Sequence, residues 1–149
     1  MGISRRDVQG RLFPGEQISC VVENVSCDWT RAGMYFYYPE LPSTHDSVAA
    51  ITSRRLIVGR PIKEGTEWLS VAGIQGVYEK PRRNFGKSWL QVTLLSNGFP
   101  AVRLCSREGD RAGAEALEEL ANRAFQSLAA AGPLNVAAHV VEIEEQDAD

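Results

Sequence analysis

The sequence predicts a small, mainly β domain (α+β) with one C-terminal helix. Three observations support this fold class: short segments of alternating apolar residues follow one another between residues 47 and 106, turn-forming residues separate them, and an amphipathic pattern begins at about Asp110. A lone helix of this length is marginal in water. We therefore expect the helix to cover an open apolar face left by the strands of a barrel or sandwich.

A short helix and a first strand are predicted at the N-terminus. Ser4 and Asp7 have the spacing of a capping box, and the helix is expected to reach about Leu12. The first strand is expected over Gln17–Val22, where apolar residues alternate. One face of this strand would carry Ile18, Cys20 and Val22.

Residues 24–46 are rich in proline and aromatic residues, and we expect them to be irregular, with residues 34–38 able to form a strand. Aromatic side chains contribute most to the energetics of many protein interfaces. The candidates for a protein-binding surface here are Trp29, Tyr35, Tyr37 and Tyr38. The alternative, an insert folded over the barrel wall, stays open.

Six further strands follow from alternation and from the turn residues between them. They are expected at Val48–Ile51, Leu56–Val58, Glu67–Ala72, Ile74–Glu79, Trp89–Leu95 and Ala101–Cys105. The clearest pair is the last, because Asn97 and Gly98 between the two strands are typical of a tight hairpin turn.

The C-terminal helix is predicted from Asp110 to Ala131, where Gly132 and Pro133 end it. Its apolar stripe consists of Leu117, Leu120, Ala121, Ala124 and Leu128, with Phe125 at the border. We expect one domain over residues 1–133 and an acidic tail over 134–149.

The tail holds five carboxylates in the last eight residues. Without them the net charge of −3 becomes +2, from 16 basic and 14 acidic residues, so no nucleic-acid partner is expected. Val140–Glu144 alternates, which fits a short strand on a sheet edge, and a frayed terminus is the alternative. The acidic tail would also be able to screen a basic segment of the chain.

A basic segment over residues 80–87 is the best candidate for an anion-binding site, and Pro81 and Gly86 predict that it is a loop. The candidate residues are Lys80, Arg82, Arg83, Phe85 and Lys87. Cations around an aromatic side chain suit an anionic membrane surface or a phosphorylated or acidic partner. At about 1 kcal/mol per cation, four cations give about 4 kcal/mol, or about millimolar binding, so a second contact is needed. A solvated turn is the alternative interpretation.

The remaining residues predict no catalytic site, no metal site and no cofactor. No nucleophile elbow or carboxylate pair stands out, and His45 and His139 are far apart in the sequence. Residues 85–88 resemble the end of a phosphate-binding loop, but Pro81 stands where glycine is required. Three cysteines without CxxC spacing predict reduced thiols. We expect neither a signal peptide nor a membrane-spanning segment.

Three segments together resemble the pleckstrin-homology-like superfamily, in particular bacterial PH and GRAM-like domains. They are Leu12–Ile18 (LFPGEQI), Ile51–Val58 (ITSRRLIV) and Trp68–Val77 (WLSVAGIQGV), and the resemblance covers about residues 12–131. It implies a partly open barrel of two near-orthogonal antiparallel sheets capped by one C-terminal helix. It also implies recognition of lipid headgroups, membranes, peptides or protein surfaces rather than catalysis, and a role in the fold for Arg55.

These observations lead to three hypotheses for the function. The first is a non-catalytic PH/GRAM-like module that recognises a protein partner, with self-association through an edge strand as an added expectation. The second is peripheral binding to anionic lipid headgroups, and the third is an enzyme or a small-ligand binder. The expected location is the cytoplasm, with the inner face of the membrane as the place of peripheral attachment.

Overall fold

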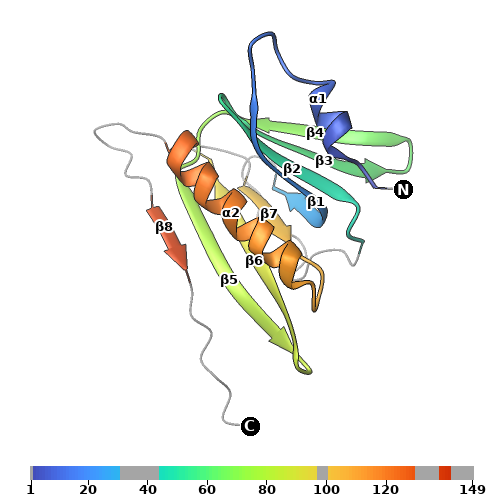
Figure 1. The fold of residues 1–149 in the computed structure, drawn as a ribbon, viewed down its shortest axis with the longest axis vertical. Helices are drawn as coiled ribbons and strands as arrows, with labels where there is room; N and C mark the ends of the chain where they lie inside the picture. The colour runs from blue at the N-terminus through green and yellow to red at the C-terminus, as the bar shows by residue number, and fades with distance from the viewer. Residues whose placement is uncertain (1, 31–43, 97–100, 130–137, 142–149) are drawn as a thin grey trace.

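The structure is a computed structural model that describes residues 2–30, 44–96, 101–129 and 138–141. Within these ranges the chain forms an eight-stranded sheet and two helices (Figure 1). The elements are α1 (Arg5–Gln9), β1 (Ile18–Trp29), β2 (Ser47–Thr52), β3 (Leu56–Ile62), β4 (Gly65–Val71), β5 (Gly76–Asn84), β6 (Lys87–Leu95), β7 (Ala101–Cys105), α2 (Arg111–Leu128) and β8 (Ala138–Val141).

The strands lie in the order β4-β3-β2-β1-β7-β6-β5-β8, so the predicted mainly β fold with a C-terminal helix is confirmed. Neighbouring strands are antiparallel except at one edge, where β8 runs parallel to β5. The sheet is therefore mixed rather than wholly antiparallel. The finer expectation, a barrel of two near-orthogonal sheets, stays a prediction.

The strand β1 belongs to both halves of the sheet. Its first part pairs with β2 as far as Val25, and its second part pairs with β7 from Ser26 onward. The register shifts between Val22 and Val25, and Asn24 lies between them with a φ of 58°. Asparagine tolerates this left-handed conformation better than most residues. The prediction that residues 24–46 are irregular is therefore wrong for residues 24–29.

The predicted face of the first strand is also partly wrong. A register shift between Ile18 and Cys20 reverses the alternation at this point. Ile18 consequently packs in the apolar cluster beside α1, whereas Cys20 and Val22 pack in the main core under α2.

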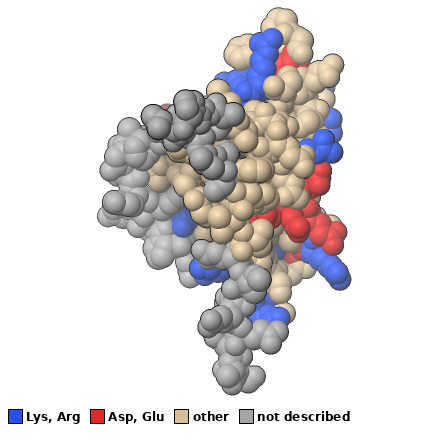
Figure 2. Space-filling model, turned by 90° about the vertical axis from the view of Figure 1, so that its left-hand side faces the viewer, with Lys and Arg blue, Asp and Glu red and all other residues tan. Residues whose placement is uncertain are grey.

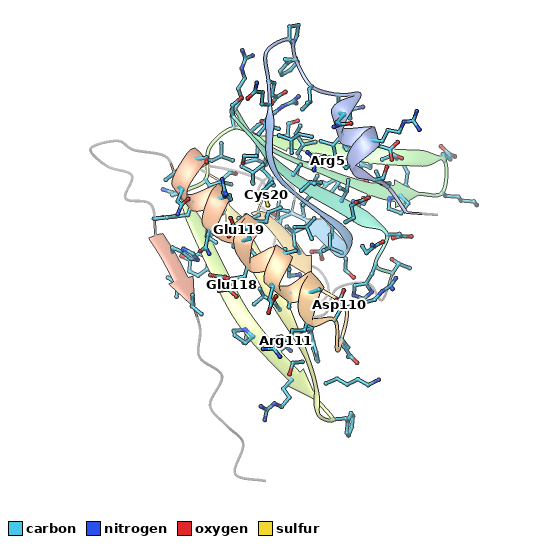
Figure 3. The ribbon with its side chains drawn as sticks, viewed as in Figure 1. Arg5, Cys20, Asp110, Arg111, Glu118 and Glu119 are labelled. Atoms are coloured by element: carbon cyan, nitrogen blue, oxygen red, sulfur yellow. The ribbon has the colours of Figure 1, made fainter. Side chains whose placement is uncertain are left out.

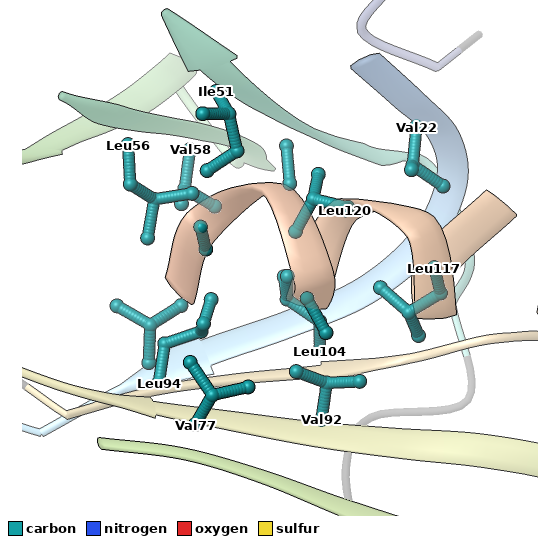
Figure 4. Close-up of a cluster of buried hydrophobic side chains, with 14 of the residues drawn as sticks. Val22, Ile51, Leu56, Val58, Val77, Val92, Leu94, Leu104, Leu117 and Leu120 are labelled. Atoms are coloured by element: carbon teal, nitrogen blue, oxygen red, sulfur yellow. The ribbon is translucent and has the colours of Figure 1, made fainter. Parts of the chain in front are cut away.

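The helix α2 covers one face of the sheet, as predicted. The five residues of its predicted stripe are buried, and Phe125 is half-buried at the border. They pack against β-strand side chains from both halves of the sheet, including Val58 of β3 and Leu94 of β6 (Figure 4). The helix begins after Asp110, whose carboxylate accepts a hydrogen bond from the backbone of Gly113 at 2.9 Å. No described helix is long and apolar enough to span a bilayer.

The short helix α1 covers the opposite face, mainly over β1 and β2. The predicted capping box is present, because the Ser4 backbone donates to the Asp7 carboxylate at 2.8 Å. The helix ends at Gln9 rather than at Leu12. Its Val8 packs against Val48 and other apolar side chains of β2 and β3, so that every residue of β2 is buried.

Candidate functional site

The basic segment is not a loop but the end of a β-hairpin. Residues 80–84 continue β5, Lys87 begins β6, and only Phe85 and Gly86 connect the two strands. The register pairs Arg82 with Trp89 and Asn84 with Lys87. We call this feature the cationic hairpin; it consists of Lys80, Arg82, Arg83, Phe85 and Lys87 with the strand ends that carry them (Figure 1).

The loop prediction failed because proline was taken as a strand breaker. Pro81 pairs with Leu90, whose backbone N–H and C=O both face Ser106 on the other side of β6. The Pro81–Leu90 pair is therefore a non-hydrogen-bonded position of the β5–β6 ladder. The nitrogen of Pro81 faces the outer edge of the sheet, where the missing donor leaves the β5–β6 ladder intact.

Phe85 at the tip combines exposure with an unusual backbone conformation. Its side chain is 96% exposed, and its φ is 51°, followed by a φ of 79° at Gly86. Two positive φ values are required for the tight type I′ hairpin turn, in which asparagine, aspartate or glycine normally fills the first position. A bulky residue in the left-handed region costs about 1–2 kcal/mol. The fold therefore holds an apolar ring in solvent at a conformational cost.

The cations surround this ring on both faces of the hairpin. Arg83 and Lys87 are exposed and Arg82 is half-buried. Because side chains alternate along a strand, Arg83 shares the face of Val77, which packs under α2, and Arg82 points to the opposite face. Among the described residues, none forms a salt bridge with these three cations. In Figure 2, basic side chains lie in the lower part of the molecule and also near its top, and acidic side chains gather between them.

An open groove of about 560 Å³ lies between the hairpin and the start of α2. Lys87 and Leu90 line it from the hairpin, and Arg111 and Glu118 line it from the helix. Figure 3 shows Arg111 at the first turn of α2 and Glu118 farther along the helix. Arg111 also contacts Glu115 at 3.5 Å, so the groove has mixed charge. The excess of positive charge therefore belongs to the hairpin rather than to the groove.

Another pair of adjacent arginines, Arg54 and Arg55, lies at the turn between β2 and β3. Arg55 donates from Nε and Nη2 to the two oxygens of Glu16, both at 2.9 Å, and from Nη1 to Ser70 at 2.7 Å. The Glu16 side chain is fully buried and also accepts a hydrogen bond from Thr52. The hydrogen bond from Arg55 is the main reason why the pKa of Glu16 falls to about 2. Arg55 thus has the structural role implied by the family resemblance.

The predicted protein-binding surface is only partly described. Trp29 lies at the end of β1, packs against the main core and has the Arg60 guanidinium 3.9 Å from its ring centroid. Tyr35, Tyr37 and Tyr38 lie outside the described residues. Trp29 is therefore partly a core residue, and recognition of a protein partner through this segment stays a prediction.

Two side-chain contacts between neighbouring strands of the sheet had no signal in the sequence. Arg103 of β7 makes two hydrogen bonds to Asp28 of β1, at 2.6 and 3.1 Å, across directly paired positions. His139 of β8 lies 2.5 Å from the carboxylate of Glu79, which is 3% exposed, in the neighbouring strand. Knowledge of the strand register would have placed both pairs, but the register could not be read from the sequence.

The thiols offer no reactive centre. The three cysteines are free, and burial raises the pKa of Cys27 above its usual range and that of Cys105 to about 12. Burial also raises the pKa of Cys20, which lies beneath α2 near Glu119 (Figure 3). Within residues 2–30, 44–96, 101–129 and 138–141, no group of three His, Cys, Asp or Glu side chains is placed to hold a metal ion.

Comparison with known proteins adds information on the fold. No family model matches the sequence, and no curated protein matches it. Among solved structures, the chain is similar to the hSac2 domain from human phosphoinositide phosphatase Sac2, with a TM-score of 0.51 and 12% sequence identity. The match covers 99% of this chain and 95% of that domain. At this identity the likeness concerns the fold alone.

Proposed function

We propose that this protein is a non-catalytic module that attaches to anionic membrane surfaces through the cationic hairpin. The observation that carries the proposal is Phe85, an almost fully exposed apolar ring held in a left-handed conformation between cations. Residues held in strained backbone conformations cluster at functional sites. A turn that served only to connect two strands would be more stable with asparagine or glycine at this position.

The energetics are those of reversible attachment. The four cations of the hairpin supply about 4 kcal/mol at an anionic surface. Insertion of the Phe85 ring adds about 2 kcal/mol. The sum of about 6 kcal/mol corresponds to a dissociation constant of tens of micromolar, which is weak binding. Binding becomes weaker still as salt screens the charges. The hairpin thus supplies the second, apolar contact that charge alone requires.

Two further observations support an anionic lipid as the ligand. The similar solved domain comes from a protein whose name describes it as a phosphoinositide phosphatase. The chain also resembles PH and GRAM-like domains, and we propose that its sheet has their two-sheet arrangement. In support of this, the long strand β1 pairs with β2 through its first part and with β7 through its second part.

The proposal is tested with vesicles of equal parts phosphatidylcholine and phosphatidylserine. We expect wild-type protein to co-sediment at low salt and to be released as salt is raised. The double variant Arg82→Glu/Arg83→Glu should bind at least about tenfold more weakly, since two attractive charges become repulsive.

The matched control is Arg6→Glu/Arg54→Glu. It makes the same change in net charge at two exposed positions near α1 and the β2–β3 turn, away from the hairpin. Its binding should remain close to that of the wild type. Equal loss of binding in both double variants would show a non-specific charge effect, and absence of wild-type binding at low salt would refute the proposal.

A further inference from the structure

The groove between the cationic hairpin and α2 carries charges of both signs. Two cations and two carboxylates line it: Lys87 and Arg111, Glu115 and Glu118. In Figure 3, Arg111 lies at the end of α2 nearer to the hairpin tip, and Glu118 lies farther along the helix. Lys87 begins β6 directly after the hairpin turn. A molecule in the groove therefore meets cations near the tip and a carboxylate farther from it.

Backbone contacts hold the two sides of the groove together. The N–H of Gly109, two residues before α2 begins, donates to the carbonyl oxygen of Ser88 at 2.8 Å. The N–H of Ser106 donates to the carbonyl oxygen of Leu90 at 3.0 Å, and its hydroxyl accepts from the Leu90 N–H at 2.9 Å. A volume of about 560 Å³ is within the range of small-molecule sites. The groove is therefore formed before a ligand arrives.

Glu118 is the carboxylate of the groove that is available to a ligand. Glu115 contacts Arg111 at 3.5 Å, whereas Glu118 is exposed and forms no salt bridge with a described residue. The exposed Lys87 has no such partner in the described ranges either. Arg111 keeps donors for a ligand, because a guanidinium has five N–H groups.

The proposed attachment places this groove at the level of the lipid headgroups. Gly86, which lines the groove, directly follows Phe85, the ring proposed to insert. From Gly86 to Leu90 the groove follows about 13 Å of extended strand. Apolar groups of peripheral proteins are buried about 5–10 Å into the boundary between headgroups and acyl chains. The cations near the tip then meet lipid phosphates, and Glu118 meets the outer end of a headgroup.

A phosphoethanolamine headgroup has the same order of charges. Its phosphate lies next to the glycerol and its primary ammonium lies at the outer end. The phosphate accepts charge-assisted hydrogen bonds from Lys87 and Arg111, and the ammonium donates to Glu118. The headgroup carries one charge of each sign, so it leaves neither end of the groove unpaired.

Phosphocholine has the same charges but fits the groove less well. Its quaternary ammonium has no hydrogen to donate to Glu118, and proteins bind such groups on aromatic rings. Trp89 is the aromatic residue of the groove, and it pairs with Arg82 on β5. Because side chains alternate along β6 and Leu90 packs in the core with α2, the Trp89 ring points to the other face.

We propose that this groove binds the phosphoethanolamine headgroup of a membrane lipid. This inference rests on the proposed function and adds a second lipid to it. The cationic hairpin supplies attraction to any anionic surface, and the groove selects surfaces that also contain phosphatidylethanolamine.

The first test needs no membrane. Glycerophosphoethanolamine is titrated into the ¹⁵N-labelled full-length chain, and the amides of Gly109 and Ala114, which line the groove, are followed by NMR. We expect saturable shifts, with binding about fivefold weaker for glycerophosphocholine, as for the loss of one exposed charge-assisted contact. The two compounds have equal net charge, so the comparison isolates the ammonium.

Glu118→Gln should remove the preference between the two compounds. Glu118 is exposed, so the substitution leaves the fold intact. The matched control is Glu119→Gln, which makes the same change in net charge one position along α2, at a residue that pairs with Arg123 and does not line the groove. The control should keep the fivefold preference.

The second test uses vesicles with a constant share of phosphatidylglycerol, an anionic lipid without an ammonium. Replacing half of the remaining phosphatidylcholine by phosphatidylethanolamine should tighten binding of the wild type and of Glu119→Gln about fivefold. Glu118→Gln should bind both kinds of vesicle equally. A preference that persists in Glu118→Gln would reflect bilayer packing and would overturn the inference.

The outcomes separate this inference from the proposed function. Equal response to the two soluble headgroups, with vesicle binding still lost in Arg82→Glu/Arg83→Glu, would overturn the headgroup site and leave the membrane function standing. Selective shifts at the groove that disappear in Glu118→Gln, without any wild-type binding to vesicles, would support the site and refute the membrane function.

Discussion

Two pairs of adjacent arginines, Arg54–Arg55 and Arg82–Arg83, lie in contrasting environments. Arg55 of the first pair is enclosed by Glu16, Thr52 and Ser70 and has become part of the fold. Arg83 of the second pair is exposed at the hairpin and forms no ion pair with a described residue.

The two environments differ because a carboxylate lies beside Arg55 and none of the described ones lies beside Arg83. Glu16 reaches Arg55 from 39 positions earlier in the sequence, and no comparable acid faces the exposed Arg83 among the described residues. A buried guanidinium requires such a partner, whereas an exposed one is available to a ligand. The comparison teaches that a basic dipeptide indicates a binding surface only where its neighbours leave it unpaired.

The largest expected effect on stability comes from removing the carboxylate that pairs with Arg55. Glu16→Gln should lower the free energy of unfolding by about 3 kcal/mol, because the mostly buried Arg55 charge loses its counterion. Arg83→Gln at the second pair should change it by less than about 0.5 kcal/mol. Urea denaturation of both variants measures this contrast. Similar losses in the two variants would contradict the distinction between a structural and a free arginine.

The pH dependence of stability should sharpen the same contrast. The hydrogen bond from Arg55 lowers the pKa of Glu16 from 4.5 to about 2 in the folded protein. A group with a depressed folded pKa stabilises the protein above its unfolded pKa, and this contribution is lost as pH falls through the folded value. The stability difference between wild type and Glu16→Gln should therefore be constant at neutral pH and shrink from pH 4.5 toward pH 2. A difference that persists unchanged at low pH would argue against this assignment.

A smaller effect on stability than that of Glu16→Gln is expected at the hairpin tip. Phe85→Asn should stabilise the protein by about 1 kcal/mol, because asparagine suits the positive φ that phenylalanine adopts at a cost. The same variant should bind anionic vesicles about tenfold more weakly, because it loses an apolar insertion of about 2 kcal/mol. Thermal denaturation and co-sedimentation measure the two changes.

Phe85→Ala separates the two contributions to this effect. Alanine removes the apolar ring but keeps a side chain that disfavours positive φ. Its stability should therefore stay near that of the wild type while its vesicle binding falls. If Phe85→Asn gained stability without losing binding, the ring would have no part in membrane attachment.

The sequence predicted the elements whose pattern is local. The spacing of Leu117, Leu120, Ala121, Ala124 and Leu128 predicted both the helix and its buried face, since helical periodicity depends only on neighbouring turns. The capping box at Ser4 was predicted for the same reason. Strand β8 was anticipated from alternation, although it begins at Ala138 rather than at Val140, and residues 142–144 lie outside the described part.

The features that were missed depend on distant partners. The second part of β1 could not be recognised in the sequence, because the register shift near Asn24 interrupts the alternation of apolar residues. The hairpin strand at Pro81 was hidden because only its pairing with Leu90 shows that the proline nitrogen faces outward. The separation of structural Arg55 from exposed Arg83 required knowing where Glu16 lies. Of the candidate site, the residue types were therefore predictable, but their conformation and pairing were not.

The shared strand β1 has a consequence for folding cooperativity. A chain cut between β4 and β5 would leave β7 without its neighbour β1, and would leave the core side of β2 and β3 without α2. Neither fragment would retain a closed set of backbone partners or a covered apolar face. We therefore expect the two halves not to be independent folding units but to unfold together in a single all-or-none transition.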